Sequence, residues 1–131
     1  MVDIGWLAGI VAVVLLGIIT LFQLALALGA PWGAAAWGGG HPGRLPGRLR
    51  LASAVVALVV YPFIGLSIII TSSPVQIRPI PGTGVVWMWV LAGLFTVGAI
   101  ANFASPSRIE RIWGPVSLAI AICCAVIALN G

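Results

Sequence analysis

The chain has 131 residues, of which 62% are hydrophobic and 6% are charged, and its formal net charge is +4 at pH 7. Soluble domains carry about 25% charged residues, so this composition excludes an ordinary soluble domain and indicates a membrane protein. The six basic residues are all arginines spread along the chain, which argues against nucleic-acid binding.

Four long apolar runs predict four membrane-spanning helices in a single domain, residues 1–131. A helix needs about 20 apolar residues to cross a bilayer, because the hydrocarbon core is about 30 Å thick. The predicted spans cover residues 4–28, 51–71, 85–104 and 112–130. The expected fold class is therefore an all-α membrane protein, a four-transmembrane-helix bundle.

The first span carries small residues and one amide that bear on its packing. Gly5 and Gly9 lie four residues apart, a spacing that favours close approach of another helix. Gln23 lies near the far end of the same span. Its amide has two interpretations, a hydrogen bond to a neighbouring helix or a contact with a polar ligand or solute.

Residues 29–50 are rich in glycine and proline, which oppose regular helix, so we expect an irregular loop at the membrane surface. Arg44, Arg48 and Arg50 suit the phosphates of lipid headgroups, or they simply mark the cytoplasmic side. His41 has no Cys, Asp or Glu beside it, so we expect a solvated loop residue and no metal site.

The second span contains Tyr61 followed by Pro62 near its middle. A proline removes one backbone hydrogen bond, so we expect a kink here. The Tyr61 hydroxyl is interpreted either as a partner of a freed carbonyl or as part of a solute path. Residues 72–84 contain three prolines and Arg78, which predicts a non-helical connection.

The third span has Asn102 near its end, where the amide either caps the helix or lines a path. Ser107 and Glu110 follow with the S-x-x-E spacing of a capping box, which predicts the start of another helix. Arg108 and Arg111 flank Glu110, so we interpret this acid as a helix cap with a local ion pair.

The fourth span contains Pro115 near its start, and we expect a second kink there. Ser117, Ala121 and Ala125 then form a ridge of small residues at four-residue spacing. Such a ridge packs against another helix of the same chain or of a second copy.

Arginines indicate the orientation of the chain in the membrane. Loops 29–50 and 104–111 hold five arginines, whereas loop 72–84 holds one. Because basic residues in short loops favour the cytoplasm, we expect the first and third loops to be cytoplasmic. Both termini and loop 72–84 are then expected on the extracytoplasmic side.

No acid, histidine or arginine lies within a predicted span, which argues against proton-coupled transport. We therefore expect a non-catalytic protein, without cofactor or metal, that acts by helix association as a homo-oligomer or as an accessory subunit beside other membrane subunits. One alternative is a carrier or channel for an uncharged or lipophilic solute that uses Gln23, Tyr61 and Asn102. A second is a headgroup-level enzyme that uses His41 and Glu110.

Three stretches, at residues 28–33 (LGAPWG), 39–46 (GGHPGRLP) and 102–113 (NFASPSRIERIW), resemble those of uncharacterised small four-span membrane proteins of high-GC bacteria. The resemblance implies a location in the bacterial inner membrane. It implies no activity.

Overall fold

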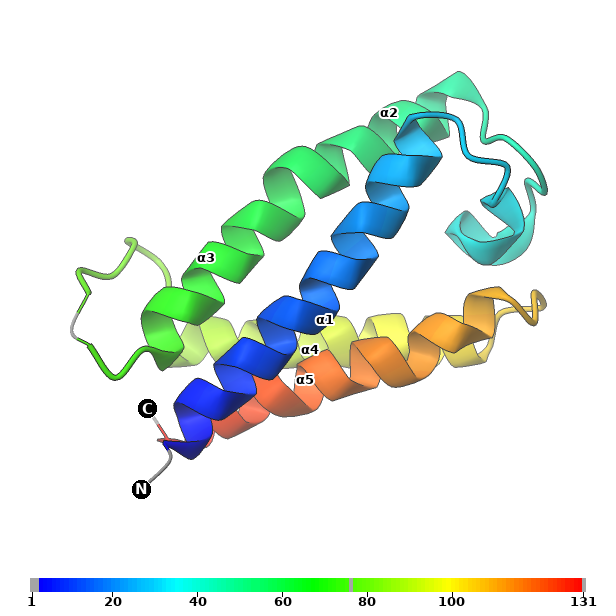
Figure 1. Ribbon diagram of the computed structural model, residues 1–131. Coiled ribbons are helices and arrows are strands. Elements are labelled where there is room, and N and C mark those ends of the chain that lie inside the picture. Colours follow the sequence, from blue (N-terminus) through cyan, green and yellow to red (C-terminus); the bar gives the residue numbers. More distant parts are fainter. Residues whose placement is uncertain (1–2, 76, 131) are drawn as a thin grey trace.

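The computed structural model describes residues 3–75 and 77–130, which form helices joined by turns and loops (Figure 1). Four helical segments are long and apolar enough to cross a membrane: Ile4–Ala27, Gly47–Ser72, Val85–Phe103 and Glu110–Asn130. The predicted all-α fold with four apolar spans is therefore confirmed. The kinks expected in the second and fourth spans stay predictions.

Helix α1 (Ile4–Ala27) has a defined cap at each end. At its start the carboxylate of Asp3 accepts hydrogen bonds from the N–H groups of Gly5, at 2.9 Å, and Trp6, at 3.2 Å. At its end Gly29 has a φ of 101°, which a residue with a side chain rarely adopts. The N–H groups of Gly29 and Ala30 bond back into the last turn, as in a Schellman motif.

The second span is longer than the sequence predicts. It begins with α2 (Gly47–Val55), continues through a π-turn (Val56–Val60) and ends with α3 (Tyr61–Ser72). The predicted start at residue 51 is too late. The first turn of α2 is polar, so a search for apolar runs does not include it.

The second hairpin follows the predicted limits to within two residues. Helix α4 (Val85–Phe103) is followed by a 3₁₀ turn (Glu110–Ile112), which leads directly into α5 (Trp113–Asn130).

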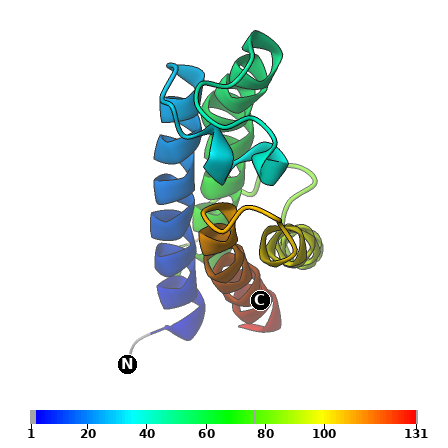
Figure 2. The same cartoon turned by 90° about the vertical axis from the view of Figure 1, so that its right-hand side faces the viewer.

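The four spans form two hairpins, α1 with α2–α3 and α4 with α5, and α1 also packs against α5. Figure 1 shows the hairpins close together where α1 begins and α5 ends, and diverging toward the opposite end. The segment 31–45, hereafter the plug, lies between the hairpins at this diverging end, as Figure 2 shows from that side. The connection 73–84 lies at the other end.

A main apolar core joins the hairpins, and a smaller one holds the plug. Ile68, Met88 and Ile120 are fully buried in the main core. The smaller cluster contains Leu26 of α1 together with Ala36 and Leu45 of the plug. Burial of these side chains attaches the plug to the end of the first hairpin.

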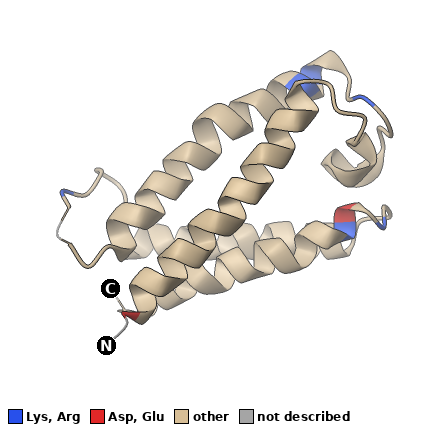
Figure 3. Ribbon diagram, viewed as in Figure 1, with Lys and Arg blue, Asp and Glu red and all other residues tan. Residues whose placement is uncertain are grey.

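The charged residues of the described chain lie at the two ends of the molecule, and the middle of each span is uncharged (Figure 3). Asp3 precedes α1 and Arg78 belongs to the connection, both at one end, and the remaining coloured segments lie at the plug end. This distribution suits a multi-pass membrane protein, since charges at bilayer depth are costly.

Candidate functional site

Backbone contacts give the plug a compact fold of two short 3₁₀ turns, Gly33–Ala35 and Trp37–Gly39. The N–H of Gly33 donates to the carbonyl of Gly43 at 2.8 Å. A Cβ atom at Gly33 would overlap the carbonyl oxygen of His41, so the chain folds this tightly only because glycine occupies the position.

Side-chain hydrogen bonds tie the plug to both hairpins. The indole N–H of Trp37 donates to the hydroxyl of Ser53 in α2 at 3.0 Å, and the indole N–H of Trp113 in α5 donates to the carbonyl of Ala35 at 3.0 Å. The hydroxyl of Ser107 donates to the carbonyl of Ala34. The plug therefore links the two hairpins where they diverge.

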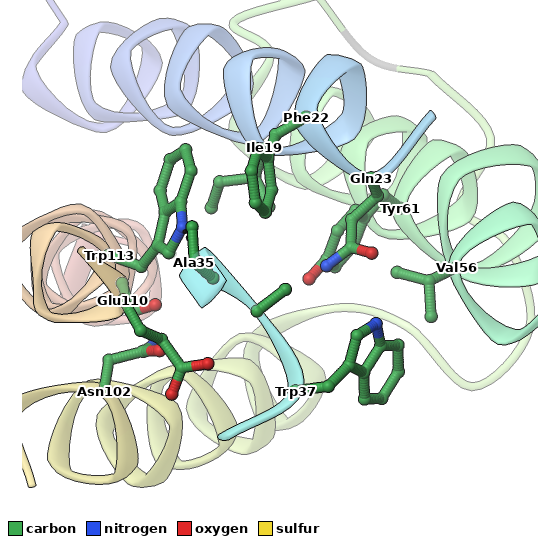
Figure 4. Close-up of a pocket in the computed structure, with 12 residues that line it drawn as sticks. Ile19, Phe22, Gln23, Ala35, Trp37, Val56, Tyr61, Asn102, Glu110 and Trp113 are labelled. Atoms are coloured by element: carbon green, nitrogen blue, oxygen red, sulfur yellow. Dashed lines mark hydrogen bonds between the residues drawn. The ribbon is translucent and has the colours of Figure 1, made fainter. Parts of the chain in front are cut away.

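A cavity of about 200 Å³ lies next to the plug, between the hairpins; we call it the chamber. Figure 4 shows the residues that line it, which are Ile19, Phe22, Gln23, Ala35, Ala36, Trp37, Val56, Tyr61, Asn102, Glu110, Trp113 and Ser117. In this view Gln23 and Tyr61 lie on one side of the chamber, whereas Asn102 and Glu110 lie on the other.

Three residues that the sequence analysis assigned to a single path, Gln23, Tyr61 and Asn102, thus line one cavity. They come from α1, α3 and α4, so only the folded chain brings them together. The side-chain oxygen of Gln23 is buried and has no hydrogen-bond partner among the described residues. A buried polar group left in this state costs about 1–3 kcal/mol.

Glu110 is also a chamber residue, and it is only 5% exposed. Its Oε2 atom accepts a hydrogen bond of 2.8 Å from the N–H of Gly38 in the plug. The capping box forms in part, since the Ser107 hydroxyl accepts from the N–H of Glu110 at 3.4 Å. The flanking Arg111 donates through Nε to the carbonyl of Ser105 at 2.8 Å.

Aromatic rings form much of the remaining chamber wall: Phe22, Trp37, Tyr61 and Trp113. The rings of Phe22 and Trp113 pack together, with centroids 4.6 Å apart and planes inclined by 46°. The sequence analysis named Tyr61 as a site residue but missed Phe22, Trp37 and Trp113. The sequence did contain a signal for them: tryptophans cluster around a loop that also contains the small residues needed for close packing.

His41 does not line the chamber that contains Glu110. Its Nδ1 atom is buried in the plug without a partner among the described residues. The carboxylate of Glu110 instead accepts a hydrogen bond from Gly38, which precedes His41 by three residues in the plug. Within residues 3–75 and 77–130, no group of three or more His, Cys, Asp or Glu side chains is placed to hold a metal ion.

Two of the three arginines assigned to lipid headgroups lie against the end of α1. Arg50 donates through Nε to the carbonyl of Ala27 at 3.1 Å. The guanidinium of Arg44 lies over Gly29, where an added Cβ would be 2.8 Å from Nη2. Cations favour the C-terminal end of a helix, so both positions support α1. Arg48 is exposed.

The small residues on the first span pack within this chain. Gly5 lies beside Asn130, with 3.5 Å between a Cβ built on the glycine and the Cβ of Asn130. A Cβ at Gly9 would overlap the hydroxyl of Ser72 in α3. The ridge on α5 is also largely covered: Ser117 and Ala121 are buried, and Ala125 is half-buried.

Comparison of the chain with protein families, with curated proteins and with solved structures finds no match.

Proposed function

We propose that this protein is a membrane carrier that binds a small solute in the chamber between its two helix hairpins. The observation that carries the proposal is the convergence of Gln23, Tyr61, Asn102 and Glu110, from four separate elements, on one cavity. Ligand sites are commonly apolar cavities with a few converging polar groups, and the chamber has this composition.

The unpartnered oxygen of Gln23 supports a bound ligand more directly. A glutamine that served only to join helices would have its oxygen bonded to a neighbouring donor. In this chain the oxygen is buried beside a cavity instead, where a ligand N–H or O–H satisfies it.

The plug suggests how solute enters the chamber. Its hydrogen bonds to Ser53, Ser107, Glu110 and Trp113 span the diverging ends of the hairpins, so release of these bonds would open the chamber at that end. We place this end in the cytoplasm of a bacterial inner membrane, because five of the six arginines lie there.

The test is retention of a bound small molecule. The protein is extracted with its surrounding lipid in polymer-bounded discs, and molecules that co-purify with it are measured by mass spectrometry. We expect a molecule that is held by the natural chain and lost from Gln23→Leu, which keeps the side-chain volume but removes the amide.

Thr20→Val is the matched control for this test. Thr20 lies one turn from Gln23 on the same helix, and its hydroxyl donates to the carbonyl of Leu16 at 2.7 Å, outside the chamber lining. This variant should retain the molecule. If the natural chain holds no small molecule, or if Gln23→Leu retains as much as Thr20→Val does, the proposed function is wrong.

A second candidate function, helix association in an oligomer or a larger membrane complex, is favoured by one surface feature. A groove of about 430 Å³ between α4 and α5 is lined largely by small residues, among them Ala92, Gly93, Ala121 and Ala125. Gly93 is exposed, and a Cβ built there meets nothing within 4 Å. Small residues let a further helix approach closely in lipid.

A further inference from the structure

We propose that the solute bound in the chamber is a small organic cation with a substituted ammonium group. The inference rests on the proposed function, and it names the chemical class of the ligand. It follows from three properties of the chamber: one buried carboxylate, a wall of aromatic rings and a small volume.

The carboxylate of Glu110 is the first property. Among the chamber's lining residues, Glu110 is the one with an acidic side chain. One carboxylate oxygen accepts from the N–H of Gly38, and the guanidinium of the adjacent Arg111 is bonded to the carbonyl of Ser105. Neither contact pairs the carboxylate with a cation, so a cationic ligand would supply the partner of opposite sign that a buried carboxylate needs.

The aromatic wall is the second property. The indole N–H groups of Trp37 and Trp113 are already bonded to Ser53 and to the carbonyl of Ala35. Both indoles are thereby fixed, and they offer the chamber their rings and no free donor. Aromatic ring faces attract cations, and cages of such rings recognise quaternary ammonium groups.

The volume and the amide on the other side of the chamber complete the assignment. A cavity of about 200 Å³ is smaller than the roughly 300–1,000 Å³ of sites for drug-sized ligands, so the cation is small. The free oxygen of Gln23 suits a hydroxyl or N–H group at the other end of the ligand. A hard metal ion is disfavoured, because it requires six or more oxygen ligands or several retained waters.

The test compares choline with 3,3-dimethylbutan-1-ol, a neutral molecule of the same shape in which carbon replaces the quaternary nitrogen. Binding of each is measured by calorimetry on the full chain in uncharged maltoside micelles. We expect choline to bind at least tenfold more tightly than the neutral molecule.

Glu110→Gln separates the charge from the hydrogen bond, because the glutamine oxygen still accepts from Gly38. We expect this variant to bind choline about tenfold more weakly, with unchanged binding of the neutral molecule and an unfolding temperature close to that of the natural chain. Phe22→Leu should lower choline affinity about threefold or more. Phe63→Leu is the control, since Phe63 is exposed and packs on Trp87 outside the chamber.

Equal binding of the two probes, or a choline preference that survives in Glu110→Gln, would overturn the cation assignment while leaving a solute-binding chamber in place. Binding of neither probe would also overturn the cation assignment. The proposed function itself is decided by the retention of a co-purified molecule and by its loss in Gln23→Leu, so the two proposals fail separately.

Discussion

The plug and the connection 73–84 are both rich in glycine and proline, yet they have opposite relations to the helices. The plug buries Ala35, Ala36 and Leu45 and is bonded to both hairpins. Among the described residues of the connection the side-chain hydrogen bonds are local, such as that from the hydroxyl of Thr83 to the carbonyl of Ile80. Loop composition therefore does not decide whether a loop is packed. The plug is packed because its small residues fit between the helices and because the indole N–H groups of Trp37 and Trp113 bond it to α2 and α5.

The largest loss of plug packing is expected when a side chain is added at Gly33. In Gly33→Ala the new methyl group overlaps the backbone carbonyl of His41, and we expect a cost of about 2–3 kcal/mol from overpacking. The unfolding temperature in micelles should fall, and amide hydrogen exchange should rise across the plug. Gly40→Ala is the control, because Gly40 has open space around it and a φ of −79°. Equal effects of the two variants would show that the packing at Gly33 does not matter.

A smaller effect is expected when one anchoring hydrogen bond is lost. Trp113→Phe keeps a ring in the chamber wall but removes the donor to the carbonyl of Ala35, which should cost about 1 kcal/mol. Trp87→Phe removes a comparable bond of 2.9 Å to the hydroxyl of Ser67, away from the plug. Hydrogen exchange at residues 33–39 should rise in Trp113→Phe alone. A similar rise in both variants would contradict the role given to Trp113.

The smallest effect is expected in the connection. Arg78 is exposed, so Arg78→Gln should change the free energy of unfolding by no more than about 0.5 kcal/mol. Amide hydrogen exchange of the Arg78→Gln variant should match that of the natural chain along all four spans. A loss of stability comparable to that of Gly33→Ala would mean that the connection is as tightly packed as the plug.

The spans were predictable because a long apolar run in lipid forms a helix, in which the backbone N–H and carbonyl groups bond to one another. The beginning of α2 was not, since Arg48 and Arg50 give its first turn the composition of a loop. Four residues of helix were therefore missed before residue 51.

The chamber was predictable in part. Gln23, Tyr61 and Asn102 were assigned to one path because polar side chains are rare at membrane depth, and they do line one cavity. Glu110 was interpreted as a cap because its spacing from Ser107 has a sufficient local explanation. Its bond to Gly38, 72 residues away, depends on how the plug folds back, and spacing along the chain carries no signal of that contact.

The π-turn Val56–Val60 sets the rotational phase of the second span. Pro62 has no N–H to donate, and one residue before it the N–H of Tyr61 bonds to the carbonyl of Val56, five positions back. One extra residue in a turn offsets the two halves of a helix by about 100°. That offset allows Ser53 to meet the plug while Tyr61 faces the chamber, so this single π-turn aligns the anchor of the plug with the wall of the cavity.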